Sequence, residues 1–167
     1  MSGTVKKIEV AANIAIIAVA VMIGVVLIHK YYIRSKTKEL PTVLIGTKIS
    51  IPNIDWSKNR QSLVLALQAG CHYCSESAPF YQRLASEASA RKIPLVAVLP
   101  QTIEEGQNYL NSLNLPIDDI RQTSLRSIGV QGTPAILLVD SNGKVKASWH
   151  GKLPPNKESE VLNSLAQ

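Results

Sequence analysis

The sequence of 167 residues contains only two cysteines and few aromatic side chains, which make up 5% of the chain. A small secreted protein stabilised by disulfides would carry several cysteine pairs, so the sequence does not belong to that class. A disulfide between Cys71 and Cys74 would close a loop too small to stabilise a fold. The two cysteines are therefore interpreted as reactive groups rather than as a structural bridge.

The greater part of the chain also lacks a large excess of charge. The formal net charge is +6, but residues 1–40, with six Lys/Arg and two Glu, contribute +4, and residues 41–167 contribute only +2. No stretch interleaves basic and aromatic residues, which is the pattern typical of nucleic-acid surfaces. We therefore predict no nucleic-acid partner, and the basic residues near the N-terminus are interpreted as contacts to lipid headgroups.

Residues 10–28 form one long apolar run, in which Asn13 is the only polar interruption. About 20 apolar residues cross the hydrocarbon core of a bilayer as a helix. Lys and Arg flank the run, and Tyr31 and Tyr32 suit the headgroup region. A cleaved signal peptide would have a shorter apolar stretch and a small-residue cleavage site, and a core helix would show a polar face. We therefore predict a single-pass membrane anchor over residues 10–33.

The predicted anchor separates a short N-terminal tail, residues 1–9, from a charged tether, residues 34–41, and a globular domain, residues 42–167. Lys and Arg are more frequent after the apolar run than before it, which slightly favours a cytosolic domain under the positive-inside rule. The difference in count is small, so it leaves the orientation of the domain open at this point.

Apolar runs and turn signals predict an α/β domain. Buried strands are expected at residues 62–68, 93–99 and 135–139, an Asn-Gly hairpin turn and a returning strand at 145–149, and short extended pieces at 42–45 and 49–54. Helices are expected at residues 71–91, with a kink at Pro79, at 102–113, with a capping box at its start, and at 124–128 and 157–166. Strands joined by helices are expected to pair in parallel, so the order of elements predicts a mixed central sheet flanked by helices.

The two cysteines, with His72 and Tyr73 between them, lie where a predicted buried strand ends and a helix begins. The unpaired N–H groups and the dipole at a helix N-terminus stabilise a thiolate, which is the nucleophile in disulfide exchange. The spacing lets Cys74 reach Cys71 from the first helical turn and release a partner that Cys71 has captured. Protonated, His72 would favour the thiolate, and Tyr73 is a candidate contact residue.

Gly132, Thr133 and Pro134 directly precede the strand predicted at residues 135–139. A proline cannot donate to the ladder of a sheet, so it is expected at the first residue of a strand. A cis bond before Pro134 would turn the Thr133 backbone toward the cysteines, and cis is the minority state for X–Pro bonds. Thr133 and Pro134 are therefore candidate site residues beside the cysteine pair.

Together these motifs resemble the thioredoxin superfamily, and within it the membrane-anchored redoxins related to cytochrome-maturation thioredoxins, over residues 42–165. Pro79, five positions after Cys74, and the stretch that follows Pro134 also carry the resemblance. The resemblance implies a thioredoxin-like fold in which Cys71 is the attacking thiol and Cys74 the resolving thiol. It also implies that Pro134 is a cis-proline beside the disulfide and that the Thr133 backbone binds substrate.

The resemblance further implies an activity and a location. The activity is that of a thiol-disulfide oxidoreductase, acting as a reductase, that exchanges its disulfide with thiols of partner proteins and receives electrons from a membrane or soluble donor. No cofactor or metal is expected beyond the redox-active disulfide. The implied location of the globular domain is the extracytoplasmic (periplasmic) side of the membrane, against the mild indication of the charge count.

The sequence departs from the pattern of this family at three places. Residues 69–70 are Ala-Gly where many relatives have Trp, Leu65 stands where many thioredoxins bury an Asp, and Ser77 stands where maturation-type reductases often carry Glu. The last two departures leave the proton acceptor for Cys74 unassigned. Glu76 is a candidate for this role, although its position is more typical of a solvated helix residue.

Other chemistries fit these residues less well than disulfide exchange does. A metallochaperone could bind Cu(I) with the cysteine pair alone, and this alternative stays open. A zinc site needs four Cys or His ligands, and a c-type haem motif needs His directly after Cys74, where Ser75 stands. A peroxidase would have Pro and Thr where Val64 and Gln68 stand, and the intact cysteine pair argues against a redox-inactive scaffold.

Overall fold

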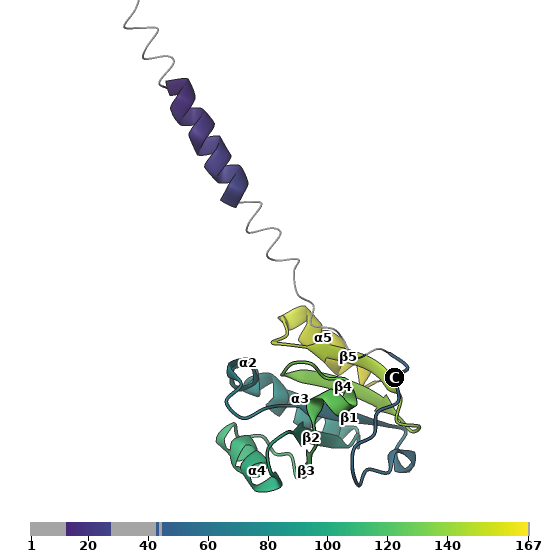
Figure 1. Cartoon of the computed structure of the whole chain (residues 1–167). Coiled ribbons are helices and arrows are strands. Elements are labelled where there is room, and N and C mark those ends of the chain that lie inside the picture. The colour runs from purple at the N-terminus through teal and green to yellow at the C-terminus, as the bar shows by residue number, and fades with distance from the viewer. Residues whose placement is uncertain (1–12, 28–42, 44, 167) are drawn as a thin grey trace, which may run out of the picture. The chain divides into compact units, whose positions relative to one another are not determined.

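The computed structural model describes residues 13–27, residue 43 and residues 45–166 (Figure 1). The chain divides into two units, Met1–Lys38 and Glu39–Gln167, and each is described by itself.

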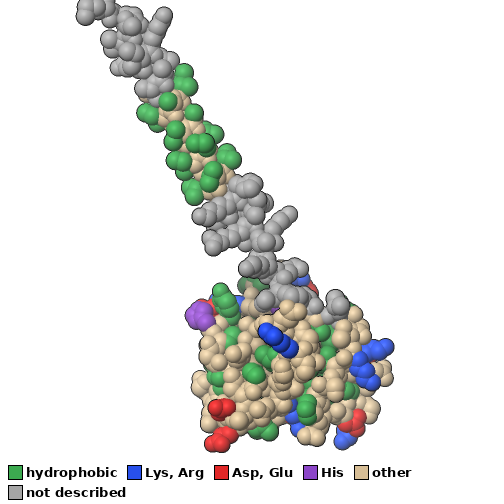
Figure 2. All heavy atoms as spheres, viewed as in Figure 1, with side chains coloured by type: hydrophobic (Ala, Val, Ile, Leu, Met, Phe, Trp, Pro, Cys, Tyr) green, Lys and Arg blue, Asp and Glu red, His purple; other side chains and the backbone are tan. Residues whose placement is uncertain are grey.

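In the first unit, residues 13–27 are helical and exposed except at Gly24. Figure 2 shows hydrophobic side chains along this helix. Among the described residues, no helix is both long and apolar enough to cross a membrane. The predicted anchor, residues 10–33, extends beyond the described helix at both ends, and the predicted tail and tether lie outside the described residues.

The second unit is built around a five-stranded mixed sheet. Its strands are β1 Gln61–Ala66, β2 Leu95–Leu99, β3 Asp119–Gln122, β4 Ala135–Asp140 and β5 Val145–His150, in the spatial order β3-β2-β1-β4-β5. β1 is parallel to β2 and β2 to β3, whereas β4 is antiparallel to both β1 and β5. Every residue of β1 is buried, because a central strand is covered on both faces of the sheet.

The direction of β4 and the presence of β3 differ from the sequence prediction. Residues 135–139 are expected to run parallel to the preceding strands, but β4 is antiparallel to β1, with Ala135 opposite Ala66. The third parallel strand is β3, which the sequence analysis misses because only Ile120 among its residues is buried. β1, β2 and β3 all finish at the same end of the sheet, and β4 starts from that end, so β4 runs antiparallel to β1.

The helices follow the predicted order with two changes of detail. They are α2 His72–Glu76, α3 Ala78–Ala90, α4 Ile103–Ser112 and α5 Pro155–Ser164, with 3-10 helices η1 Trp56–Lys58 and η2 Leu125–Ile128. The single kinked helix predicted over residues 71–91 is divided at Ser77, and Pro79 lies in the first turn of α3, where its missing N–H needs no partner. The capping box of α4 is confirmed, since Thr102 and Glu105 each bond the backbone N–H of the other.

The two faces of the sheet are covered by different kinds of structure. α3, α4 and α5 contribute to one core, which includes Tyr81 and Leu110. The opposite face carries a second core around Val64 and Leu137, covered by residues of the 43–56 segment and by η2. The predicted mixed sheet is confirmed, and the short helix predicted at residues 124–128 is the 3-10 helix η2, which covers the second face together with the 43–56 segment.

A tight turn joins β4 to β5, as the Asn-Gly pair predicts. The Asp140 carboxylate accepts hydrogen bonds from the backbone N–H groups of Asn142 and Lys144, both at 2.8 Å, and these bonds hold the pKa of Asp140 below its ordinary value. Gly143 has a φ of 78°, and a Cβ at this position would lie 2.8 Å from Trp56 Cδ1. Both the backbone conformation and the contact with Trp56 require glycine here.

Candidate active site

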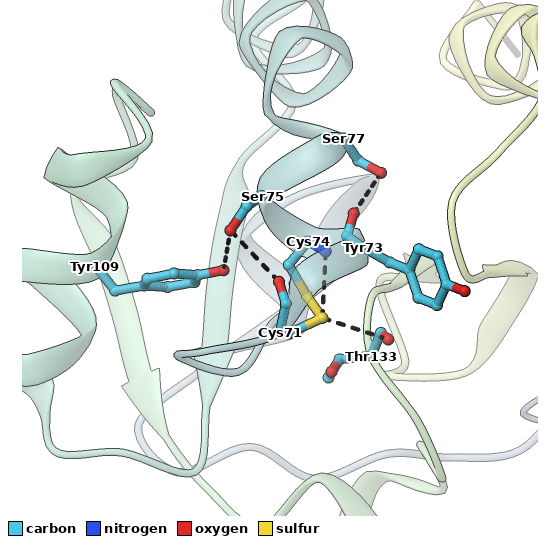
Figure 3. Close-up of a disulfide and its surroundings, with 7 residues drawn as sticks. All are labelled: Cys71, Tyr73, Cys74, Ser75, Ser77, Tyr109 and Thr133. Carbon is cyan, nitrogen blue, oxygen red and sulfur yellow. Dashed lines mark hydrogen bonds between the residues drawn. A yellow bond between two sulfur atoms is a disulfide. The ribbon is translucent and has the colours of Figure 1, made fainter.

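Cys71 lies at the N-cap of α2, at the end of the sheet where the parallel strands β1 and β2 finish. It forms a disulfide with Cys74, with a Cα–Cα distance of 5.2 Å (Figure 3). The Cys74 N–H donates to Cys71 Sγ at 3.2 Å, and the Cys71 carbonyl accepts from the N–H groups of Cys74 and Ser75 at 3.1 and 3.2 Å. In the reduced protein the same N–H group, together with the N-terminus of α2, would stabilise a thiolate on Cys71.

The two cysteines differ in their accessibility. Cys74 is 0% exposed and belongs to the core beneath the helices, whereas Cys71 is partly exposed. A disulfide of another protein can therefore approach Cys71 but not Cys74. This geometry favours Cys71 as the attacking residue and Cys74 as the resolving residue.

The structure brings Thr133 and Pro134 to the cysteine pair. Their peptide bond is cis, as the sequence analysis anticipates, and the Thr133 carbonyl oxygen lies 3.6 Å from Cys71 Sγ (Figure 3). A disulfide sulfur carries no hydrogen, so this approach is a van der Waals contact, whereas a Cys71 thiol could donate to the same oxygen. Pro134 is buried, and its carbonyl accepts from the Gly151 N–H at 2.8 Å, which ties the loop to the end of β5.

His72 and Tyr73 both lie on the surface, with 78% of the His72 side chain exposed. His72 Nε2 lies 3.2 Å from Glu76 Oε1, and Lys152 Nζ lies 3.0 Å from Glu76 Oε2. The hydrogen bond from Lys152 is the largest cause that holds the pKa of Glu76 below its ordinary value. A carboxylate that is already ionised and paired is a poor proton acceptor, so the geometry does not favour Glu76 as the base for Cys74.

Ser77 contributes more than the sequence analysis assigns to it. It is 6% exposed, its hydroxyl donates to the Tyr73 carbonyl at 2.8 Å, and it is the polar side chain whose interaction with the buried Tyr81 hydroxyl partly offsets the effect of burial on the Tyr81 pKa. Burial raises the pKa of Tyr81 well above its ordinary value. The hydrogen bond from Ser77 to the Tyr73 carbonyl fixes the turn between α2 and α3, close along the chain to Cys74. The spacing of Tyr73, Ser77 and Tyr81, four residues apart, is the sequence signal that could have indicated these contacts.

Sequence reasoning also missed Lys152 and Tyr109. Lys152, in the segment between β5 and α5, reaches the end of α2 through its ion pair with Glu76. Tyr109 comes from α4, and its hydroxyl lies 3.5 Å from Ser75 Oγ, a weak contact at that distance (Figure 3). Both contacts join residues far apart in the sequence, and no local sequence pattern predicts them.

The chemistry available at this site is that of its sulfur atoms. Within residues 13–27, 43 and 45–166, no three His, Cys, Asp or Glu side chains are grouped so as to hold a metal ion. A paired nucleophilic and resolving cysteine can exchange a disulfide with another protein without any further group.

Solved structures with the same arrangement of strands and helices include a thiol:disulfide interchange protein from Bacteroides sp., with 20% identity, a TM-score of 0.59, and coverage of 75% of this chain and 92% of that one. The thioredoxin domain of a thiol-disulfide oxidoreductase from Bacteroides vulgatus matches with 17% identity, a TM-score of 0.56, and coverage of 77% and 100%. At these identities the likeness concerns the fold alone. The second unit therefore has a thioredoxin-like fold.

The family follows from the sequence match. Residues 44–165 match the Redoxin family, and the chain belongs to it. A curated relative, the "Probable thiol:disulfide interchange protein DsbE-2" of Pasteurella multocida (strain Pm70), is 30% identical over 97 residues, which cover 55% of this chain and 49% of the relative. The chain thus matches about half the length of that relative.

Proposed function

We propose that this chain is a membrane-anchored thiol-disulfide oxidoreductase that exchanges the Cys71–Cys74 disulfide with thiols of partner proteins and acts as a reductase. The observation that carries the proposal is the placement of this disulfide at the start of α2, with Cys71 3.6 Å from the Thr133 carbonyl and Cys74 sealed in the core. Membership of the Redoxin family and the likeness to a thiol:disulfide interchange protein support it. No cofactor beyond the disulfide is required.

The proposed reaction proceeds in two exchange steps. In the reduced protein, the Cys71 thiolate attacks a partner disulfide, forming a mixed disulfide while the partner's other sulfur leaves as a thiolate. Cys74 then attacks Cys71 Sγ, which forms the intramolecular disulfide, and the partner's remaining sulfur leaves with the Cys74 proton as a thiol. Two electrons pass to the partner. A membrane or soluble dithiol donor restores the reduced protein by the same steps in reverse.

The proposed location is a membrane crossed once by residues 10–33, with the domain on the extracytoplasmic (periplasmic) side. The apolar run at residues 10–28 and the exposed hydrophobic side chains of the helix at residues 13–27 support an anchor. The resemblance to membrane-anchored redoxins supports this side of the membrane. A membrane-impermeant maleimide, applied to intact cells after reduction, is expected to label Cys71, and labelling only after permeabilisation would place the domain in the cytosol.

Trapping of the partner tests the proposed exchange. In Cys74→Ala, the mixed disulfide cannot be resolved, so a partner is expected to accumulate on Cys71 in a band that reducing agent removes. The double variant Cys71→Ser/Cys74→Ala is the matched control and should trap nothing. Purified wild-type protein should also reduce insulin disulfides, and Cys71→Ser should not. Tight Cu(I) binding, with no trapped partner and no insulin reduction, would overturn the proposal in favour of a metallochaperone.

A further inference from the structure

A cavity outside the cysteine motif lies beside η2 and the loop that follows it. Its volume is about 370 Å³, and Arg126, Gly129 and Gln131 line it. These residues present a guanidinium and an amide, and no carboxylate stands among the lining residues that the structure describes. The described wall of the cavity therefore carries a positive charge and is suited to an anionic group, and the exchange steps proposed above make no use of it.

Arg126 supplies the positive charge of this cavity. It has no ion-pair partner within the described parts of the chain, whereas Arg83 and Arg91 each pair with a carboxylate. A guanidinium presents its N–H donors in a planar fork that matches the two oxygens of a carboxylate. Arg126 is exposed and, as far as the described residues go, unpaired, so its guanidinium can receive a carboxylate from another molecule.

The cavity lies close to the reactive sulfur. Gln131 precedes Thr133 by two positions, and the Thr133 carbonyl oxygen is 3.6 Å from Cys71 Sγ. Two residues of extended chain span about 7 Å. A polypeptide bonded to Cys71 through its own cysteine can therefore extend its neighbouring residues to the cavity wall at Gln131, and Arg126 lines the same cavity.

We propose that the Arg126 cavity binds an acidic side chain of the partner protein, a few residues from the cysteine that Cys71 attacks. Arg126 is then a specificity residue, which makes disulfides flanked by Asp or Glu better substrates than disulfides in neutral surroundings. This inference rests on the proposed exchange reaction and adds the kind of partner sequence that the site prefers.

Single-turnover kinetics with synthetic peptides test the proposal. Each peptide carries one cysteine as a mixed disulfide with thionitrobenzoate, and either Asp or Asn at one position within about four residues of that cysteine. The full chain is reduced and freed of reductant. Cys71 attacks the peptide sulfur and thionitrobenzoate leaves as a coloured thiolate. Cys74 then attacks Cys71 Sγ, and the peptide sulfur leaves with the Cys74 proton as a thiol. The protein dithiol becomes a disulfide as the mixed disulfide becomes thionitrobenzoate and a peptide thiol, so no other reductant is needed.

The ratio of the Asp rate to the Asn rate is the decisive quantity. For wild-type protein at low salt, this ratio is expected to reach about two- to fivefold at the best position, the range expected for one partly exposed ion pair, and to fall as salt is added. Arg126→Gln should bring the ratio to about one, and Arg126→Glu should invert it. Lys58→Gln is the matched control: it removes a charge beside a second cavity at the start of β1, whereas Cys71 follows the end of β1, and it should keep the wild-type ratio.

Two results would overturn the inference. One is a wild-type ratio near one at every position, and the other is a ratio above one that persists in Arg126→Gln. Both are distinct from failure of the proposed function, because in that case no peptide releases thionitrobenzoate at a rate that depends on Cys71.

Discussion

The interaction between the hydroxyls of Ser77 and Tyr81 allows a stability prediction in which the effects of the two substitutions are not additive. In Ser77→Ala, the Tyr81 hydroxyl loses its partner while its side chain stays 2% exposed, and a buried unsatisfied hydroxyl costs about 1–3 kcal/mol. The Tyr73 carbonyl loses less, because it also accepts from the Ser77 backbone N–H at 3.2 Å. Tyr81→Phe removes the hydroxyl itself and is expected to cost about 0.5–1.5 kcal/mol.

The double variant Ser77→Ala/Tyr81→Phe leaves no hydroxyl without a partner. We therefore expect its loss of unfolding free energy to be about 1 kcal/mol smaller than the sum of the two single losses. Urea denaturation of the oxidised proteins measures the unfolding free energy of the wild type, of the two single variants and of the double variant. Ser159→Ala, which removes a hydroxyl from the exposed face of α5, is the control and should change little. Losses that add to within about 0.5 kcal/mol would refute the coupling.

Three further stability predictions follow from other contacts. Gly143→Ala places a Cβ at φ 78° against Trp56 and should lower the unfolding free energy by about 1–3 kcal/mol; an unchanged midpoint in urea would refute this. Thr102→Ala removes the side-chain bond that caps the Glu105 N–H and should lower the unfolding free energy by about 0.5–2 kcal/mol in the same assay. An unchanged unfolding free energy would show that the capping box does not stabilise α4. Burial lowers the pKa of His150, so the unfolded chain binds more protons than the folded chain below the ordinary value of 6.5, and stability should fall as the pH drops through this range. His150→Gln should flatten that slope in denaturation curves measured across pH, and an equal slope in both proteins would contradict it.

The parts of the fold that the sequence predicts well depend on local signals. Cys71 and Cys74 stand at a helix start because a buried apolar run ends just before them, and both features can be read within a dozen or so residues. The hairpin before β5 follows from an Asn-Gly pair, and the start of α4 follows from Thr102 and Glu105. In each case the side chains that specify the structure are neighbours in the sequence.

The features that the sequence does not predict depend on distant contacts or on short elements. β3 has four residues, of which only Ile120 is buried, so no alternation of apolar and polar residues marks it as a strand. The ion pair between Glu76 and Lys152 joins residues 76 positions apart, and only the folded sheet brings them together. The predicted direction of β4 is wrong for a related reason: the direction of β4 depends on β3, which the sequence does not reveal as a strand.

The bonds made by Gly151 and Lys152 have a consequence for how the protein could be monitored. These adjacent residues contact the two segments that meet at the redox centre, since Gly151 bonds the Pro134 carbonyl and Lys152 pairs with Glu76 at the end of α2. A displacement of the segment that leads into α5 would therefore disturb both contacts. The partly buried Leu153 nearby is the place from which an attached environment-sensitive dye could follow such a displacement optically.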